Sequence, residues 1–595
     1  MKKIFIKYIL ALLLVLLFPA CEDYLNIPSE ANVSEKEVFG TYFSFQSYVD
    51  QIYNYICEPM GYLTSSPNMG GETVATMAVT TAYKAMRGEN FTTRGFYQVT
   101  SNNGGIPGMW QAGWASIRLA NVGLANLNKL EASEEEKALI EGQLLFFRGY
   151  FHYEILTAWG PIPYINKALN PDEIRLPRHY SYKGKKNYQA CTEYIVEDLA
   201  RAAELLPLAW NNPTINLGRV TKLAAMAFQA RALLYAGSPL MNEVSGNQAV
   251  PDLEYMRRAA EVSGAAIRIA EENPDIFGLV AWSDYQSMFT STTNRSIWTK
   301  ETLMGRFGLR DGVNEKGTGL LNNKLRAYIP DGNTFGGNTQ HETMTQNFVD
   351  KFEMADGTLY KTEYDQDNLL RWDFRDPRFR FNVYVDRDNP VDDSKSAFKL
   401  ELFTGGKTMV AVNGSLTPYI MHKLWPKGVN AKSVPISPET NNFRIMTPLM
   451  RLAEVYLIYA EAQNEASGSA ETIANGATIT ALQAVNKVRL RANHVPTTAT
   501  GGAHGSFRKM ILNERAVELI CEAAQYWHDI RRWKIGQTLD GQSMYTLDFD
   551  KNWTPSSFVR REVFKQTFGS RNYWLPFPQA QTQMYLEFPQ NPGWE

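Results

Sequence analysis

One segment, Leu449–Glu465 (LMRLAEVYLIYAEAQNE), constrains the fold of this 595-residue chain more than any other. Its apolar residues form two stripes at the three- and four-residue spacing of a helix: Leu452, Val455, Tyr456 and Tyr459 on one, and Ala453, Leu457 and Ala460 on the next. Only a narrow face is left for polar residues. A helix that is apolar on nearly every side packs between neighbours rather than on a surface. Alanines beside tyrosines allow close approach, so we expect stacked helix pairs.

Other stretches with helical periodicity lie on both sides of a long irregular region. They cover Glu35–Cys57, Met109–Leu130, Ser133–Trp159, Tyr188–Leu206, Arg219–Ala236, Tyr255–Glu272, Ile479–Arg491 and Ser506–Trp533. Ser133 and Glu136 form a capping box, and Gly160 and Pro161 end the same helix. We predict a mainly α fold of tetratricopeptide-like helix pairs (an α-α superhelix). No clean repeat of about 34 residues is visible, so this prediction depends on the spacing of the helices.

Three regions lack this pattern. Residues 58–108 are rich in glycine and aromatic residues, and such long inserts between helices are more often functional than idle. Residues 276–447 read as an inserted subdomain of loops and short strands, for example at 296–298 and 381–385. Residues 536–595 are aromatic and proline-rich, and we expect them to wrap onto a helical scaffold formed by about 35–275 and 448–535. The domain organisation that follows is a single domain, 35–595.

The N-terminus reads as a targeting signal, residues 1–20. Three lysines precede the apolar run Ile9–Phe18, which is shorter than the roughly 20 residues that span a bilayer. Ala20 precedes Cys21, as in a bacterial lipoprotein signal, so we predict lipidation at Cys21 and a polar tether over residues 21–34. The alternative is a secretory signal with an incidental cysteine.

The other three cysteines predict no disulfide framework. Cys57, Cys191 and Cys521 are an odd number for a secreted chain. Cys191 and Cys521 lie within helical patterns, and we expect both to be buried thiols.

Catalytic and metal-binding motifs are lacking. The sequence has no HExxH, GxSxG, P-loop or GxGxxG, and its seven histidines never take a metal-ligand spacing. His152 and His528 lie in helical patterns and are expected to be structural. A net charge of −2 gives no argument for nucleic acid. We predict no catalytic residue, no cofactor and no metal.

Two groups of acidic residues leave alternatives open. Asp386–Asp393 could attract calcium, but Pro390 stands where an EF-hand needs a ligand, so a solvated acidic turn is expected. In Ile511–Trp533, carboxylates alternate with arginines and read as buried or half-buried ion pairs, with Glu518 and Glu522 on one face near Arg515. A glycosidase pair stays open, because among 62 Asp and Glu residues some pair always fits.

Taken together, the chain resembles the SusD/RagB family of outer-membrane nutrient-binding lipoproteins of Bacteroidetes. The similar blocks, in order, are Cys21–Leu25, Arg148–Ile165 with its WGPIP turn, Gly218–Gly237, Arg375–Arg378, Arg451–Glu465, Asn513–Trp533 and Trp574–Trp594. One departure, Ala523-Ala524-Gln525, replaces a glycine-containing step that is commoner in the family.

The resemblance implies a binding protein, not an enzyme. It would be lipid-anchored in the outer membrane, facing the cell exterior, and would capture a glycan and deliver it to a SusC-like TonB-dependent β-barrel transporter as a hinged lid. Peptide or another non-sugar nutrient, a helical glycoside hydrolase, and a scaffold that binds only protein are the alternatives.

No family motif carries the ligand residues, so the candidates are aromatic residues of the irregular loops, since rings offer flat faces to sugars. They are Tyr83, Phe96, Tyr97, Phe307, Tyr328 and Phe335. Trp282, Tyr285 and Phe289 have helical spacing and are expected to be core.

Overall fold

A computed structural model describes residues 34–56, 109–291, 297–307, 343–389, 399–410, 415–424, 444–499, 506–522 and 525–595. Its longer helices are α3 (Glu35–Phe39), α4 (Tyr42–Tyr53), α7 (Met109–Asn126), α8 (Glu134–Trp159), α9 (Asn187–Leu205), α11 (Lys222–Ala236), α13 (Leu253–Glu272), α18 (Leu452–Ser467), α19 (Ala481–Arg491), α20 (Ser506–Glu518) and α21 (Gln525–Arg532). Short helices are α10 (Pro213–Asn216), α12 (Pro239–Val244), α15 (Gln346–Val349), α16 (Pro377–Asn382), α17 (Lys407–Val410) and α22 (Gln579–Thr582).

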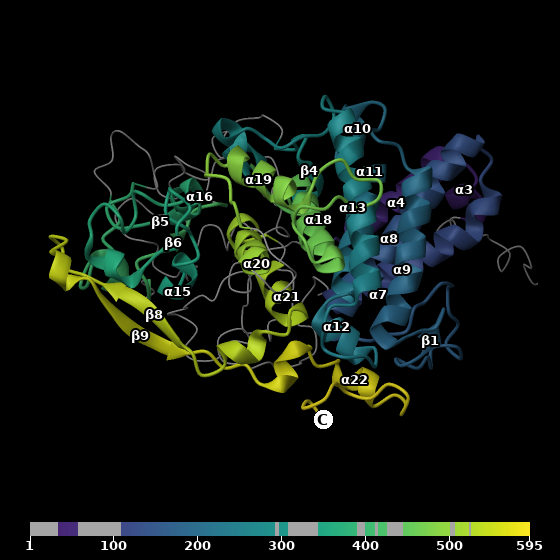
Figure 1. Ribbon diagram of the computed structural model, residues 1–595. Coiled ribbons are helices and arrows are strands. Elements are labelled where there is room, and N and C mark those ends of the chain that lie inside the picture. The colour runs from purple at the N-terminus through teal and green to yellow at the C-terminus, as the bar shows by residue number, and fades with distance from the viewer. Residues whose placement is uncertain are drawn as a thin grey trace, which may run out of the picture.

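The long helices pack one against the next. The series runs α7, α8, α9, α11, α13, α18 and α19, each in contact with its neighbour (Figure 1). This confirms the mainly α fold of stacked helix pairs. Close approach has a visible cause at Gly149 of α8, where an added Cβ would lie 3.3 Å from the Ile195 carbonyl oxygen of α9.

The irregular region lies between two helices that are neighbours in space. Helix α13 ends at Glu272 and α18 begins at Leu452, yet the two pack side by side. The region holds short strands and turns of helix: β3 (Thr290–Ser291), β4 (Thr302–Phe307), β5 (Val383–Tyr384), β6 (Ile420–Met421), β7 (Arg444–Arg451), η3 (Trp282–Met288) and η4 (Thr362–Gln366). Strand β7 lies between β3 and β4, antiparallel to both, and β5 pairs with β6. The loop-rich region is therefore inserted into the helical series.

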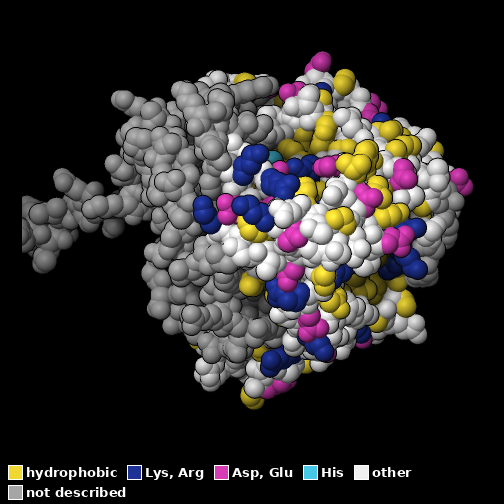
Figure 2. Space-filling view, turned by 90° about the vertical axis from the view of Figure 1, so that its left-hand side faces the viewer, with side chains coloured by type: hydrophobic (Ala, Val, Ile, Leu, Met, Phe, Trp, Pro, Cys, Tyr) yellow, Lys and Arg dark blue, Asp and Glu magenta, His cyan; other side chains and the backbone are white. Residues whose placement is uncertain are grey.

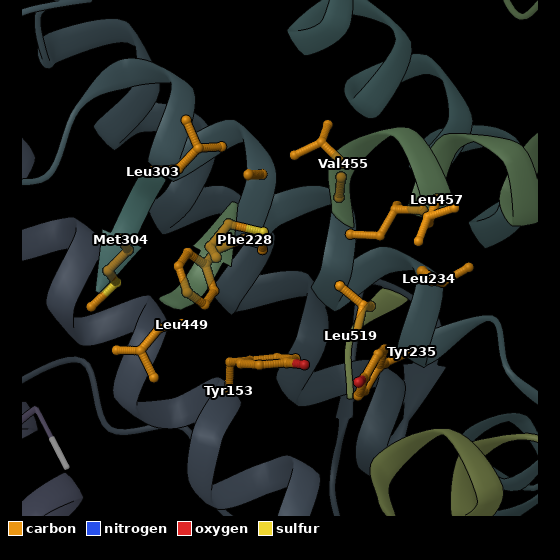
Figure 3. Packing of buried hydrophobic residues seen from close by; sticks show 14 of the residues in the cluster. Tyr153, Phe228, Leu234, Tyr235, Leu303, Met304, Leu449, Val455, Leu457 and Leu519 are labelled. Atoms are coloured by element: carbon orange, nitrogen blue, oxygen red, sulfur yellow. The ribbon is translucent and has the colours of Figure 1, made fainter. Parts of the chain in front are cut away.

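Helix α18 is more deeply buried than its sequence pattern indicated. Every residue from Leu452 to Glu465 is buried, the polar ones included. The helix starts at Leu452, because Leu449–Arg451 belong to β7, so the predicted start at Leu449 is wrong. Figure 3 shows Val455 and Leu457 of α18 among the buried residues that also include Phe228 of α11, Leu303 of β4 and Leu449 of β7.

Several predicted boundaries need correction. The helix expected over Glu35–Cys57 is two helices, separated at Gly40. The helix expected over Ser506–Trp533 is also interrupted, and Cys521 takes a left-handed φ of 60°. Residues 381–385 are the end of α16 followed by the two-residue β5, and 297–299 form no strand. In contrast, the Ser133–Glu136 capping box starts α8 as predicted.

The C-terminal region contacts the helical body, and it contains an unpredicted hairpin of β8 (Ser543–Asp548) and β9 (Val559–Lys565). Asn591 donates to the carbonyl oxygens of Trp159 and Leu575, at 2.8 and 2.7 Å. Arg178 donates to the Asn591 side chain at 2.6 Å. These buried contacts tie the last residues to the end of α8 and to the loop that follows it.

Two cysteines and the aromatic residues between 282 and 289 lie in or against the core. Cys191 and Cys521 are both buried, and burial raises the pKa of Cys191 to about 12. Tyr285 and Phe289 are core residues and Trp282 is partly buried against them. Among the described helices, none combines the length and apolarity that a membrane span needs.

Candidate functional site

The structure does not test the residues that the sequence nominates for ligand binding. Tyr83, Phe96, Tyr97, Tyr328 and Phe335 lie outside the described residues, and so does the lipidation candidate Cys21. Phe307 is the last residue of β4, but only its backbone is described. These six aromatic residues and Cys21 stay predictions.

An open hollow lies between η4 and β9, in the part of the molecule that carries the loop-rich region. It has a volume of about 450 Å³ and is lined by Thr362, Glu363, Asp365, Gln366, Phe558, Val559 and Arg560. Hydroxyl, amide, carboxylate and guanidinium groups thus line one concavity, and such groups can hydrogen-bond a polar ligand. We take this hollow as the candidate functional site.

Arg560 of β9 fixes one wall of the hollow. Its guanidinium donates to Asp365 at 2.5 Å and to Asp350 at 2.7 Å, and the Tyr360 hydroxyl donates to Asp365 at 2.8 Å. Burial raises the pKa of Asp350, although Arg560 opposes the rise. Burial alone would lower the pKa of Arg560, but its hydrogen bonds to both aspartates raise it. The guanidinium is therefore a permanent positive charge held by two carboxylates.

The aromatic ring at this hollow has no face to offer to a ligand. Phe558 stacks on Phe549, with 4.7 Å between ring centroids and 15° between planes. The Arg371 guanidinium lies 3.2 Å from the Phe558 centroid. Since both contacts occupy the ring faces, a ligand in the hollow would meet polar groups, the ring edge and Val559, without stacking on Phe558.

One exposed apolar side chain lines the hollow, and others lie in the same loop-rich region. Val559, which lines it, is 55% exposed; elsewhere in the loop-rich region, Leu369 and Phe374 in the loop after η4 are 57% and 51% exposed. Figure 2 shows this end of the molecule, where hydrophobic side chains lie among Lys, Arg, Asp and Glu. The surface there is mixed in character and carries no field of one sign.

Buried carboxylates lie behind this surface, where α20 and α21 meet β7, and each is held by a cation. Glu518 accepts from Arg451 and Arg378, at 2.8 and 2.9 Å, and from Arg491. Burial alone would raise the pKa of Glu518, but the three guanidiniums outweigh burial and hold it well below the usual range. Glu522 contacts Lys423 at 2.5 Å. The ion-pair interpretation is confirmed, and these carboxylates are poor acid–base catalysts.

The partners in this network differ from those that helical spacing suggested. Arg515 does not pair with Glu518 or Glu522; it donates to Asp529 at 2.9 Å, and Asp529 in turn accepts from Arg532. Arg532 donates to Glu461 of α18 at 2.5 Å. Arg515–Asp529 joins the consecutive helices α20 and α21, Arg532–Glu461 joins α21 to α18 across 71 residues, and together these pairs hold the three helices.

His152, His528 and the described part of the acidic turn, residues 386–389, are also structural, while Asp392 and Asp393 lie outside the described residues. His152 is buried, and its two ring nitrogens contact the Arg148 carbonyl oxygen and the Ile165 backbone N–H, at 2.8 and 3.0 Å. Burial lowers the pKa of His152 to about 3, and it also lowers that of His528. Asp386 is buried and accepts from the Leu402 N–H, so the expectation of a solvated turn is wrong for this residue. Within the described residues, no group of His, Cys, Asp and Glu is arranged to hold a metal.

Sequence reasoning missed the hollow entirely. Asp350, Asp365 and Arg560 come from three elements, and Arg560 is 195 residues from Asp365. No local pattern marks such a group. Tyr545 and Thr546 in β8 and Val563 and Phe564 in β9 are residue types that favour strands, and they are the weak signal that could have located the hairpin.

Comparison with known proteins finds two family models and several relatives that match this chain. A model of the SusD family matches residues 300–594, and a model described as "Starch-binding associating with outer membrane" matches residues 23–234. The chain is 24% identical over 511 residues to SusD-like protein P2 of Formosa agariphila, covering 84% of this chain and 82% of that protein.

Solved structures of other proteins share the fold of this chain. A SusD-like carbohydrate binding protein of Bacteroides fragilis superposes with a TM-score of 0.65 at 20% identity, covering 92% of this chain and 98% of that one. A structure with xylogluco-oligosaccharide gives a TM-score of 0.60 at 16% identity, covering 92% and 98%. At these identities the structural likeness shows a shared fold, while the two family models show the relationship.

Proposed function

The chain belongs to the SusD/RagB family, and from this we propose that it is a glycan-binding lipoprotein of the outer membrane. It faces the cell exterior, captures oligosaccharide or polysaccharide, and hands it to a SusC-like TonB-dependent transporter. The observation that carries the proposal is the match of two SusD-type family models to both halves of the chain.

Relatives support the choice of ligand. One structural neighbour is named a carbohydrate binding protein and another is a structure with xylogluco-oligosaccharide. The hollow between η4 and β9 supplies amide, hydroxyl and carboxylate groups suited to sugar hydroxyls. The ligand-binding role extends to the predicted aromatic residues Tyr83, Phe96, Tyr97, Phe307, Tyr328 and Phe335, which would add stacking faces that the hollow lacks.

The role is binding without turnover. The buried carboxylates described above are bound to arginine or lysine, and Glu518 is kept ionised by three guanidiniums. A glycosidase needs one carboxylic acid with a raised pKa facing the scissile bond, together with a second carboxylate. Asp350 has a raised pKa, but its carboxylate is engaged by Arg560 and by Gln346.

Affinity gels test the proposal. A soluble form starting after Cys21 is run through gels that contain xyloglucan, amylopectin, laminarin or galactan, and the glycan is then assayed for new reducing ends. We expect retardation by at least one glycan with no reducing ends released. Release of reducing ends would favour the glycosidase alternative, and retardation by none, with binding of peptides instead, would favour a peptide nutrient.

The transporter is tested separately. Outer membranes of the source cells, solubilised in mild detergent, should yield a large β-barrel protein that co-purifies with this chain. Its absence would contradict the proposed handover but would leave glycan binding standing.

A further inference from the structure

Four aromatic rings form a continuous stack that leads from the core to the surface, at the end of the molecule opposite to the hollow. His152 of α8 stacks on Tyr164 with 4.1 Å between centroids, and Tyr164 stacks on Tyr194 of α9 at 4.7 Å. Tyr194 in turn stacks on Tyr182, with 3.6 Å between centroids and 12° between planes. Tyr182 is the outermost ring and is half-buried, while His152 is fully buried.

A tight hairpin holds Tyr182 in this position. Strand β1 (Ser181–Tyr182) pairs with β2 (Lys185–Lys186), and Tyr182 lies opposite Lys185. The two residues between them, Lys183 and Gly184, both have positive φ, 48° and 75°, as in a type I′ turn. Such a turn matches the twist of its strands, so the hairpin presents the ring without needing a ligand to order it.

The hydroxyl end of the ring is also fixed. The Tyr182 hydroxyl donates to the Glu197 carboxylate at 3.0 Å, and Lys183 binds the same carboxylate at 2.6 Å. The Lys183 ammonium lies over the Tyr182 ring, 5.6 Å from its centroid, while it binds Glu197. Glu197 and Lys183 are 41% and 57% exposed at their side chains, so both can also reach a ligand beside the ring.

Among the described residues no second ring stacks on Tyr182 besides Tyr194, and the Lys183 ammonium over the ring belongs to a side chain that is 57% exposed and can move aside for a ligand. We propose that Tyr182 is a second glycan contact, on which a neutral pyranose ring stacks by its apolar face while Glu197 and Lys183 hydrogen-bond its hydroxyls. A neutral sugar fits because the two flanking charges cancel.

This inference rests on the proposed function and adds a location to it. The β1–β2 hairpin and the β8–β9 hairpin lie at opposite ends of the molecule in Figure 1. One long polysaccharide can therefore be held at two places at once. Such bivalent binding raises the apparent affinity for the polymer above that for a short oligosaccharide.

The test uses the soluble form starting after Cys21 in gels of xyloglucan, amylopectin, laminarin and galactan. For the glycan that retards the unmodified protein, Tyr182→Ala should weaken binding about 3- to 10-fold, because a stacking contact is lost. Tyr182→Phe keeps the ring and should retain most of the binding. Phe43→Ala is the matched control, because Phe43 is an exposed ring (82%) outside any such stack, and it should change nothing.

A second measurement does not depend on the variants folding. Nitration of Tyr182 by tetranitromethane, followed by peptide mass spectrometry, should slow when the unmodified protein is saturated with that glycan. Unchanged binding by Tyr182→Ala, or unchanged nitration under saturation, overturns the second contact while the proposed function stands. Failure of the unmodified protein to bind any of the four glycans contradicts both.

Discussion

The Arg451 guanidinium donates to the Glu518 carboxylate across 2.8 Å, with both side chains fully buried. Arg451 is the last residue of β7 and Glu518 the last residue of α20. Arg451 also donates to Glu301, at 2.8 Å, beside β4. The loop-rich region is thus joined to the helices by charges that have no access to water, and their removal one at a time is costly.

Substitution of Glu518 should destabilise the fold strongly. Glu518→Gln leaves the guanidiniums of Arg451, Arg378 and Arg491 buried with a carboxylate missing. We expect a loss of about 3–5 kcal/mol in the free energy of unfolding, measured by urea titration.

Glu134→Gln is the matched control, because Glu134 pairs with Lys137 on the surface and its side chain is 91% exposed. That change should cost less than about 1 kcal/mol. Equal costs for the two substitutions would show that the buried network does not stabilise the fold.

Gly160 forms the turn that ends α8, where the chain packs against Trp574 of the C-terminal region. Its φ is 86° and its ψ −157°, a conformation open essentially to glycine alone, and an added Cβ would lie 3.1 Å from the Trp574 ring. We expect Gly160→Ala to lower the free energy of unfolding by about 2–4 kcal/mol, from strain and displacement of Trp574 together.

Gly468 separates these two causes. It also has a positive φ, 71°, but nothing lies within 4 Å of an added Cβ. Gly468→Ala should cost only about 1–2 kcal/mol. If Gly160→Ala lowers the free energy of unfolding by no more than Gly468→Ala does, the contact with Trp574 adds no cost.

The pH dependence of stability should carry the signature of Glu465. Burial raises its pKa from 4.5 to about 7, although Arg508 opposes the rise. Between these values the folded state holds more protons than the unfolded state, so the contribution of this carboxyl to stability falls as pH rises through that window. Glu465→Gln, which stays neutral, should gain about 1–3 kcal/mol relative to the unmodified protein between pH 5 and pH 8.

Urea titrations at pH 5, 6, 7 and 8 measure this difference. Parallel profiles for Glu465→Gln and the unmodified protein would contradict the raised pKa.

Membrane attachment should depend on Cys21. Cys21→Ala removes the sulfur that would carry the lipid. We expect the variant to move from the membrane fraction to the soluble fraction in sedimentation and immunoblotting. Retention of the variant in membranes would show that another element anchors the chain.

The sequence predicted the helical scaffold well where local signals were strong. Ser133 and Glu136 mark the start of α8, and Gly160 marks its end, because a cap and a positive φ are encoded in single residues. The break near Cys521 escaped prediction, since its left-handed φ has no local glycine to announce it. The start of α18 was misplaced because Leu449–Arg451 pair with β4 about 150 residues earlier in the chain, and register with so distant a strand leaves no local pattern.

The candidate site shows the same limit more sharply. Buried ion pairs were foreseen from Glu518 and Arg515, but their partners were not, because Glu518 binds Arg378, 140 residues away. The hollow requires Asp350 and Arg560, 210 residues apart, to meet. Tyr182, Tyr194 and Tyr164 were not nominated at all, since stacking depends on how β1 folds back onto α9.

The central claim is that this chain binds a glycan and leaves it intact. Isothermal titration of the soluble form with oligosaccharides cut from the glycan that retards it in gels, followed by mass spectrometry of the oligosaccharide, tests this most directly. We predict saturable binding and an unchanged oligosaccharide mass. Absence of binding to every glycan fragment tested, or recovery of shorter fragments, would contradict it.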